Sequence, residues 1–364
     1  MISRDTVLRA ARSALVVLAA FAIAGVIYQI TGYSLGQVFS GTWEGAVSAP
    51  GALDSSLRWA VPLLLIALGV TIAFRAGFFN VGAQGQLYAG AIAALLVGVW
   101  VKGLPTPIGI VLVVLAGCIG GAIWSLVPGV LRAYLQADEV ITTLMMNFIA
   151  LLLLQWVASG PLKDPAGSGQ ADQTRSVADH LRLSDATGIS LRIVLLAAVA
   201  TVAVGVLLNR TQFGLRVRVA GRNPTMARWQ GVDARHLAVQ AFMLSGLLAG
   251  LAGAIELLGP GGQLTYGFSP DVGFIGIVIA LVGGLRIGGV VIAALFFGGL
   301  HAAILYLPIV TNLPSSALDL LNGLVALLIT ISAVPAIWHR RRRRAAESSA
   351  LNTDVPRVEV SAAP

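Results

Sequence analysis

Three carboxamide side chains, Asn80, Gln84 and Gln86, stand among glycines at the start of an apolar run that continues to Leu96. Each carboxamide offers hydrogen-bond donors and an acceptor without carrying a charge. In hydrocarbon these groups need partners, supplied by neighbouring helices or by a polar solute in a cavity. The segment therefore predicts one of two things. It is either a pathway lined by neutral polar groups, or a place where glycines such as Gly82 allow close helix packing with glutamine as the link.

A second polar group lies inside the apolar segment 139–158. Asn147 is in the middle of that segment, and Thr143 lies one turn earlier. An asparagine at this depth needs a partner on another helix or on a substrate, whereas a threonine hydroxyl can bond back to its own helix. Phe148 could stack on a flat ring, or it could serve packing or interfacial anchoring. With packing as the alternative for each, the residues that we predict to line a pathway are Asn80, Gln84, Gln86, Asn147, Thr143 and Phe148.

The elements that position these residues belong to a membrane protein. Of the 364 residues, 57% are apolar and only 11% are charged, whereas soluble domains carry about 25% charged residues. A spanning helix needs about 20 mostly apolar residues. We therefore predict an all-α, polytopic membrane protein with about ten transmembrane helices, one or two of them short or broken. The expected spans are 14–31, 57–74, 82–101, 107–131, 139–158, 191–208, 236–258, 272–285 (the short one), 287–307 and 315–338.

The basic residues predict the orientation of these spans. With the N-terminus in the cytoplasm, 18 of the 24 lysines and arginines lie inside, as the positive-inside rule requires. Both termini are then cytoplasmic, and the net charge of +8 reflects topology and not nucleic-acid binding. The transmembrane domain covers 1–338, with an extracytoplasmic loop at 159–190 and a cytoplasmic segment at 209–235. The tail 339–364 is basic, and its composition predicts disorder. The first span also resembles a signal peptide, so its cleavage stays open.

Several kinds of chemistry are disfavoured by the sequence. It contains no phosphate-binding GxxxxGK[ST] loop and no HExxH, CxxC or GxSxG motif, and its histidines are too scattered to predict a metal site. We therefore do not expect an enzyme. A carrier coupled to protons or sodium usually has ionisable residues inside its spans. The candidates here are Glu256, Asp319 and the pair Asp138 and Glu139, and each is explained more simply as a cap or an interfacial residue.

The cytoplasmic segment 209–235 is predicted to contain a short helix. Asn223 suits the N-cap, Pro224 suits the first helical position, and Gly231 would end a helix over 225–230. Its spaced arginines fit two interpretations equally well. One is an amphipathic helix lying on anionic lipid, and the other is a docking helix for a cytoplasmic partner.

The same segment carries a family resemblance. GRNPTMARWQGVDARH resembles the "G-x-N-P-x-A-A-R-Y-x-G-I" segment of ABC importer permeases of the branched-chain amino acid and simple sugar type. FNVGAQGQLYAGA is similar to their "N-I-G-x-E-G-Q" segment, and DVGFIGIVIALVGG resembles "G-F-x-x-I-A-V-A-L-L-G". DEVITTLMMNFIALLLLQWVASGPLKDP resembles the corresponding stretch of the nucleoside-importer branch. The four motifs follow the family's order over about residues 57–335.

The resemblance implies a permease subunit of the bacterial cytoplasmic membrane that moves nucleosides inward by alternating access. The implied partners are a second related permease, an extracytoplasmic substrate-binding lipoprotein and a double-cassette ABC ATPase. That ATPase would hold ATP and Mg²⁺, so this chain would bind no cofactor itself. The positions that match the family's ATPase-docking helix are Gly221, Arg222, Asn223, Pro224, Ala227, Arg228 and Gly231. Met226 and Trp229 replace the usual alanine and tyrosine, and Gln84 replaces the usual glutamate.

Neutral carboxamides suit the hydroxyls and base edges of a nucleoside. The alternatives are a permease for simple sugars, of the ribose or galactose type, and a stand-alone secondary carrier. A membrane enzyme is the third alternative, and it is disfavoured because the chain has no recognisable catalytic set.

Overall fold

The computed structural model describes residues 34–165, 172–183, 190–259 and 261–311, together with the isolated positions 22, 23, 25, 26, 29, 30 and 323. Apart from those positions, the predicted first and tenth spans, Asp319 and the basic tail lie outside the described residues. The chain divides into two units. The first, Met1–Leu35 with Ser316–Pro364, holds only scattered described residues, and the fold described below is that of the second, Gly36–Ser315.

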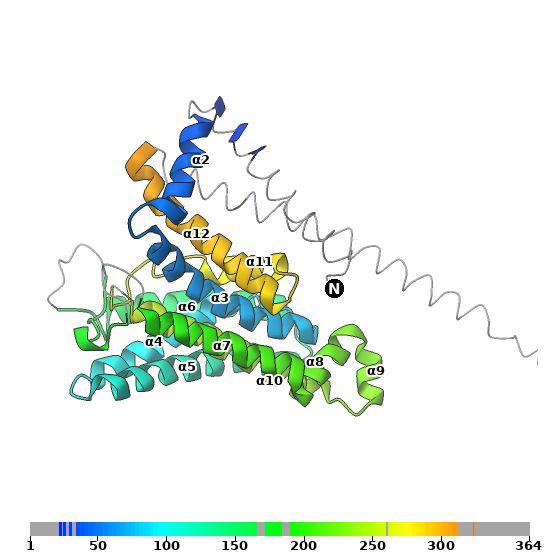
Figure 1. Ribbon diagram of the computed structural model, residues 1–364. Coiled ribbons are helices and arrows are strands. Elements are labelled where there is room, and N and C mark those ends of the chain that lie inside the picture. Colours follow the sequence, from blue (N-terminus) through cyan, green and yellow to red (C-terminus); the bar gives the residue numbers. More distant parts are fainter. Residues whose placement is uncertain are drawn as a thin grey trace, which may run out of the picture. The chain divides into compact units, whose positions relative to one another are not determined.

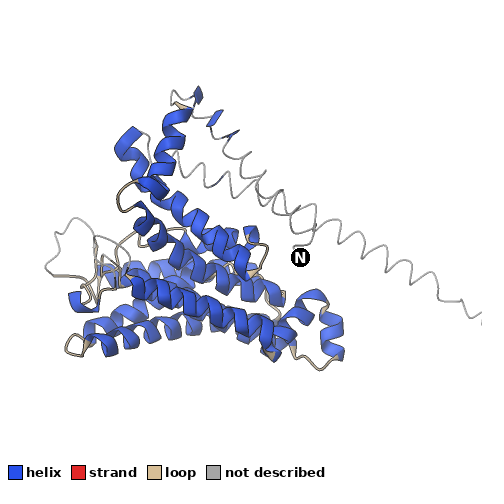
Figure 2. Ribbon diagram, in the orientation of Figure 1, coloured by secondary structure: helices blue, strands red, loops and turns tan. Residues whose placement is uncertain are grey.

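Every regular element in the described ranges is a helix (Figure 2). Seven helices are long and apolar enough to cross a membrane, and they coincide with seven of the predicted spans. These seven are α3 (Ala52–Ala76), α4 (Ala83–Trp100), α5 (Thr106–Leu135), α6 (Glu139–Ser159), α7 (Leu191–Arg210), α10 (Ala234–Leu257) and α12 (Ile287–Thr311). The short eighth segment is α11 (Val272–Val282). The predicted all-helical membrane fold is confirmed, whereas the total of about ten spans is not.

The shorter helices lie at the ends of the spans. The helix α2 (Leu35–Trp43) and a π-helical turn (Glu44–Ser48) precede α3, and a 3₁₀ turn (Asp179–Leu181) lies in the connection before α7. Two further helices, α8 (Gln212–Arg222) and α9 (Pro224–Trp229), join α7 to α10. They lie together at one end of the spans, opposite the connection between α6 and α7 (Figure 1). We call these two ends the α9 end and the α6–α7 loop end.

The helices α5 and α10 meet along a row of small residues, which we call the glycine seam. Positions four apart share one face of a helix, and glycine there lets two backbones approach closely. A Cβ on Gly121, for example, would overlap the carbonyl oxygen of Gly246 and lie 2.7 Å from the Cα of Gly250. The seam consists of Gly117, Gly121, Ser125 and Gly129 on α5 and of Gly246, Gly250 and Ala254 on α10, with the Phe242 side chain packed on Gly129 at one end.

Two more helices close on α10 in the same way. Gly90 of α4 lies against Gly250 and Gly117, so that three backbones meet at one point of the seam. On α3, a Cβ at Gly69 would lie 2.8 Å from the carbonyl oxygen of Ser245. The centre of the molecule is therefore built from main-chain contacts, and α10 is shared by all of them.

The short helix α11 reaches only halfway across the fold. Its 11 residues span about 16 Å at the rise of an α-helix, against a hydrocarbon core of about 30 Å. The chain just after its last turn is held at the α9 end, where Arg75 Nε donates to the carbonyl oxygen of Leu285 at 2.6 Å. Its second turn lies near the middle of α3, because Gly276 packs on Ile66. The other half of the span is irregular chain, which is tolerated at such depth only when it is buried in protein or lines a cavity.

We expect Gly250→Ala to lower the free energy of unfolding by about 1–3 kcal/mol, the usual range for an added methyl in a filled core. The new Cβ would meet the Gly117 carbonyl oxygen and lie 2.9 Å from the Cα of Gly121. Gly288→Ala on α12 is the matched control, since nothing lies within 4 Å of its added Cβ. Thermal unfolding in detergent measures both, and equal melting temperatures would contradict the proposed tightness of the seam.

Candidate functional site

The predicted pathway residue Asn80 is fully buried and ties the start of α4 to α10. Its Nδ2 donates to Gln86 Oε1 at 3.1 Å and to Ser245 Oγ at 2.8 Å. Its Oδ1 accepts from Gly82 N at 2.9 Å and from Gln86 Nε2 at 3.1 Å. Both donor hydrogens of Asn80 are therefore used within the fold, and the two carboxamides exchange a pair of hydrogen bonds.

Gln84 connects α4 with the irregular chain before α11. Its Nε2 donates to the carbonyl oxygen of Ser269 at 2.9 Å, and its Oε1 accepts from the backbone N–H of Gly273. One carboxamide thus forms hydrogen bonds to the chain on both sides of Pro270 and Asp271. We call this pair of hydrogen bonds the Gln84 clip. The side chain is almost completely buried.

Asn147 links α6 to the same region from the other side. Its Nδ2 donates to the carbonyl oxygen of Val81 at 3.0 Å, and its Oδ1 accepts from Gly85 N at 2.8 Å. Thr143 lies beside Gly82, but its hydroxyl donates to Glu139 O at 2.6 Å within its own helix. The back-bonding alternative that the sequence offered for Thr143 is therefore the one observed.

Phe148 does not join this cluster. Its side chain is 59% exposed, and the side chain of Trp156, two turns further along α6, is 61% exposed. Both rings therefore lie on the outer surface of α6. The structure brings five of the six predicted pathway residues together and leaves Phe148 apart. In this conformation the carboxamides bind the helices to one another, and contact with a substrate stays a prediction.

The ionisable residues singled out in the sequence also have local partners. Asp138 Oδ1 caps α6 by accepting from Val140 N at 2.9 Å, and Glu139 pairs with Arg132 at 3.1 Å. Glu256 pairs with Arg58 at 3.0 Å near the α6–α7 loop end of α10. Among the described residues, no group of three or more His, Cys, Asp or Glu side chains could hold a metal ion.

The predicted docking helix is present as α9. Asn223 Oδ1 accepts from Met226 N at 3.0 Å, Pro224 is the first helical residue, and Gly231 follows the helix with φ of 76°. Ala227 is buried, while Trp229 is 88% exposed. A large aromatic side chain is thus displayed at the α9 end with no cover from the described chain.

The preceding helix α8 was missed in the sequence, although Thr211 marks its start. The Thr211 hydroxyl accepts from Gly214 N at 3.3 Å, which is an N-cap contact. At its far end, Gly221 packs directly on the carbonyl oxygen of Arg75. The α8–α9 pair is therefore seated on the last turn of α3.

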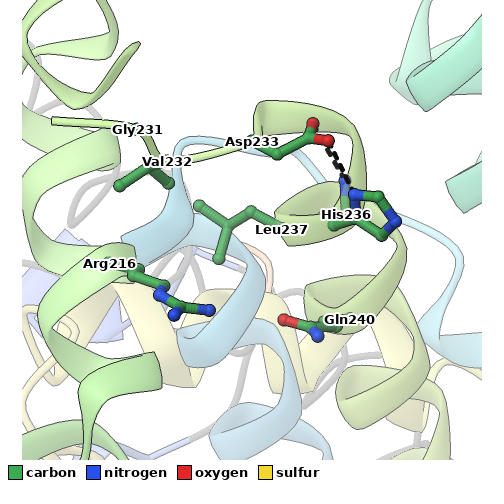
Figure 3. Close-up of a pocket in the computed structure, with 7 residues that line it drawn as sticks. All are labelled: Arg216, Gly231, Val232, Asp233, His236, Leu237 and Gln240. Atoms are coloured by element: carbon green, nitrogen blue, oxygen red, sulfur yellow. Dashed lines mark hydrogen bonds and ion pairs between the residues drawn. The ribbon is translucent and has the colours of Figure 1, made fainter. Parts of the chain in front are cut away.

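A pocket of about 250 Å³ lies between α8 and the start of α10. The Arg216 guanidinium and the Gln240 carboxamide face one another across it (Figure 3).

Asp233, at the edge of this pocket, caps α10 through Arg235 N at 2.7 Å and accepts from His236 Nδ1 at 2.6 Å. The hydrogen bond from His236 lowers the pKa of Asp233, followed by that from the Arg235 backbone. Because the shift is downward, the charged cap is lost only as the pH falls through that lowered pKa.

Comparison with known proteins decides the family. Residues 52–333 match the family described as the permease component of the branched-chain amino acid transport system. The chain belongs to this permease family. The match includes all seven spans, α8, α9 and α11, so the family predicted from the four motifs is confirmed, and the chain is a multi-pass membrane protein.

Three relatives of the permease have named substrates. The guanosine ABC transporter permease protein NupP of Bacillus subtilis is 33% identical over 85% of this chain and 90% of its own length. The glucose ABC transporter permease protein TsgB13 of Haloferax volcanii is 32% identical, over 87% and 86% respectively. The nucleoside ABC transporter permease protein NupB of Lactococcus lactis is 28% identical, over 77% and 80%.

We expect Asn80→Leu to destabilise the permease by about 1–3 kcal/mol, because Ser245 and Gln86 would be left buried without their partner. The matched control is Gln155→Leu on α6, a carboxamide that makes no side-chain hydrogen bond among the described residues. Thermal unfolding of the purified chain in detergent compares the two. If both variants melt like the wild type, the network does not contribute to stability.

Proposed function

We propose that the permease moves nucleosides into the cell and that ATP hydrolysis on a partner protein drives the movement. Two of the named relatives are permeases for guanosine or nucleosides, and the first of them aligns with 85% of this chain. That similarity is the observation that carries the proposal. The cluster of neutral carboxamides agrees with it, since nucleosides present hydroxyls and base edges without charge.

The helix α9 is the surface on which the partner ATPase would dock. Trp229 and Met226 are 88% and 54% exposed, and large aromatic side chains are enriched in protein interfaces. Ala227 is buried and holds the opposite side of the helix against the fold. Arg228, which is exposed on the same short helix, would pair with an acidic group of the ATPase.

A path of direct contacts leads from α9 to the centre of the fold. Gly221, at the end of α8, packs on the backbone of Arg75. The Arg75 side chain in turn holds the carbonyl oxygen of Leu285, just beyond α11. A displacement of α9 would thus reach both α3 and α11, and through α11 the Gln84 clip. Alternating access would use this connection.

The other elements of the proposal follow from the orientation. The α9 end carries Arg75, Arg132, Arg210 and Arg286 at the ends of its spans and would face the cytoplasm of a bacterial cell. Both termini would then be cytoplasmic. The opposite end would receive substrate from an extracytoplasmic binding lipoprotein. A second, related permease would complete the pathway, and the ATPase would carry two cassettes with their ATP and Mg²⁺.

A second candidate substrate class is simple sugars. The relative TsgB13, named as a glucose permease, is nearly as similar as the guanosine permease. Sugars share the neutral hydroxyls to which carboxamides bond.

Uptake of labelled guanosine, uridine, ribose and glucose by cells with and without this chain tests the substrate and the energy source together. We expect nucleoside uptake that stops when ATP is depleted and continues when a protonophore collapses the proton gradient. Uptake of sugars alone would favour the second candidate. Uptake that fails with the gradient while ATP is maintained would contradict an ATP-driven permease and indicate a secondary carrier.

Arg228→Glu is expected to abolish uptake while leaving membrane insertion intact, because it reverses the charge at the proposed ATPase contact. Arg210→Glu is the matched control: it makes the same change at an exposed position at the same end, outside α9. Co-purification of the ATPase with each variant gives the second readout. Normal uptake by the Arg228→Glu variant would exclude the docking role of this arginine.

A further inference from the structure

A carboxylate lies at half-depth in the fold and has no hydrogen bond or ion pair among the described residues. Asp271 directly precedes α11, whose first half packs against Gln84 at the start of α4 and near the middle of α3. Its side chain is exposed and receives no hydrogen bond or ion pair from the described part of the chain. An ionised carboxylate at this depth is strongly disfavoured against lipid, so such residues face a water-filled cavity, a partner or a substrate.

The backbone around Asp271 is held rigidly. Asp271 and Ser269 adopt positive φ values of 60° and 43°, a conformation that costs energy for residues other than glycine and persists only where the surroundings enforce it. The Gln84 clip supplies that enforcement, because it bonds the carbonyl of Ser269 and the amide of Gly273 on either side. The buried glutamine thereby fixes where the carboxylate of Asp271 is presented.

Aromatic side chains flank this carboxylate along the chain. Tyr266 is 74% exposed and Phe274 is 38% exposed, and both belong to the same irregular segment and first turn of α11. Exposed rings of this kind offer flat faces on which a nucleobase can stack. A carboxylate accepts hydrogen bonds from two adjacent hydroxyls, which is how acidic residues bind the ribose of dinucleotides.

We propose that Asp271 binds the ribose hydroxyls of a nucleoside as it crosses the permease, with Tyr266 and Phe274 available to its base. The proposal rests on the proposed function and names a contact residue for it. It assigns the substrate contact to the exposed segment before α11, and it makes Gln84 a positioning residue for that segment.

The test is the maximal uptake rate of guanosine and of 2′,3′-dideoxyguanosine by the complete transporter carrying Asp271→Asn. Replacing the charged acceptor by a carboxamide should lower guanosine uptake roughly tenfold or more, while uptake of the dideoxy compound, which lacks both hydroxyls, should change little. Asp54→Asn, an exposed aspartate at the start of α3, is the control and should alter neither rate.

Three outcomes would overturn the assignment. Unchanged guanosine uptake by the Asp271→Asn variant would show that the carboxylate is not used. An equal loss for both compounds, at normal membrane levels, would indicate contact with the second permease in place of substrate. If the wild-type chain carries no nucleoside at all, the proposed function fails and the assignment of Asp271 fails with it. The first two outcomes, in contrast, overturn the assignment while the wild-type chain still carries guanosine.

Thiol labelling keeps the proposal testable if the asparagine variant does not assemble. Cys118 is the single cysteine of the chain, so Asp271→Cys combined with Cys118→Ala carries one reactive group. A membrane-impermeant thiol reagent should label it in the assembled transporter, and guanosine should slow the labelling several-fold. Labelling that is absent, or that guanosine does not affect, would place this position away from the substrate.

Discussion

The backbones of α5 and α10 touch along the glycine seam, and the positions of the neighbouring helices depend on that contact. Between helices surrounded by lipid there is little hydrophobic driving force, so association relies on close packing and interhelical hydrogen bonds. Both are found on α10. Gly250 meets α5 and α4 through the main chain, and Ser245 receives the hydrogen bond from Asn80. The same helix therefore supplies the packing surface and one of the polar partners.

Because backbones meet so closely, little space is left for side chains at the centre, and the carboxamides there bond to one another or to main-chain groups. Asn80 and Gln86 exchange hydrogen bonds, while Asn147 and Gln84 bond to main-chain groups of neighbouring segments. The Asn80–Gln86 pair lies at the start of α4, whereas the bonds of Asn147 and Gln84 connect segments that are far apart in the sequence. The carboxamides thus determine how α4 sits against α6, α10 and the start of α11, and any opening of the fold has to exchange these bonds for others.

The sequence predicted features that are governed by local physics. Seven spans and the short α11 follow from runs of apolar residues, because backbone in hydrocarbon must be helical. The boundaries of α9 follow from Asn223, Pro224 and Gly231, which act within one turn. Contacts across the chain could not be derived in this way. The partners of Gln84 lie 185 and 189 residues away, and no pattern in the sequence indicates which side of α6 carries Phe148. The role of Asp271 was missed because an aspartate before a helix looks like an ordinary N-cap, whereas its backbone is left-handed and its side chain caps nothing.

The geometry of the Gln84 clip has a consequence for motion. One planar carboxamide bonds to Ser269 before Pro270 and to Gly273 after it, so a displacement of α11 along α4 that is large enough to break one of these bonds also breaks the other. Both are lost together, and intermediate positions gain nothing in exchange. The start of α11 should therefore move between discrete positions and not by continuous displacement. The barrier between these positions is set by the simultaneous loss of two buried hydrogen bonds.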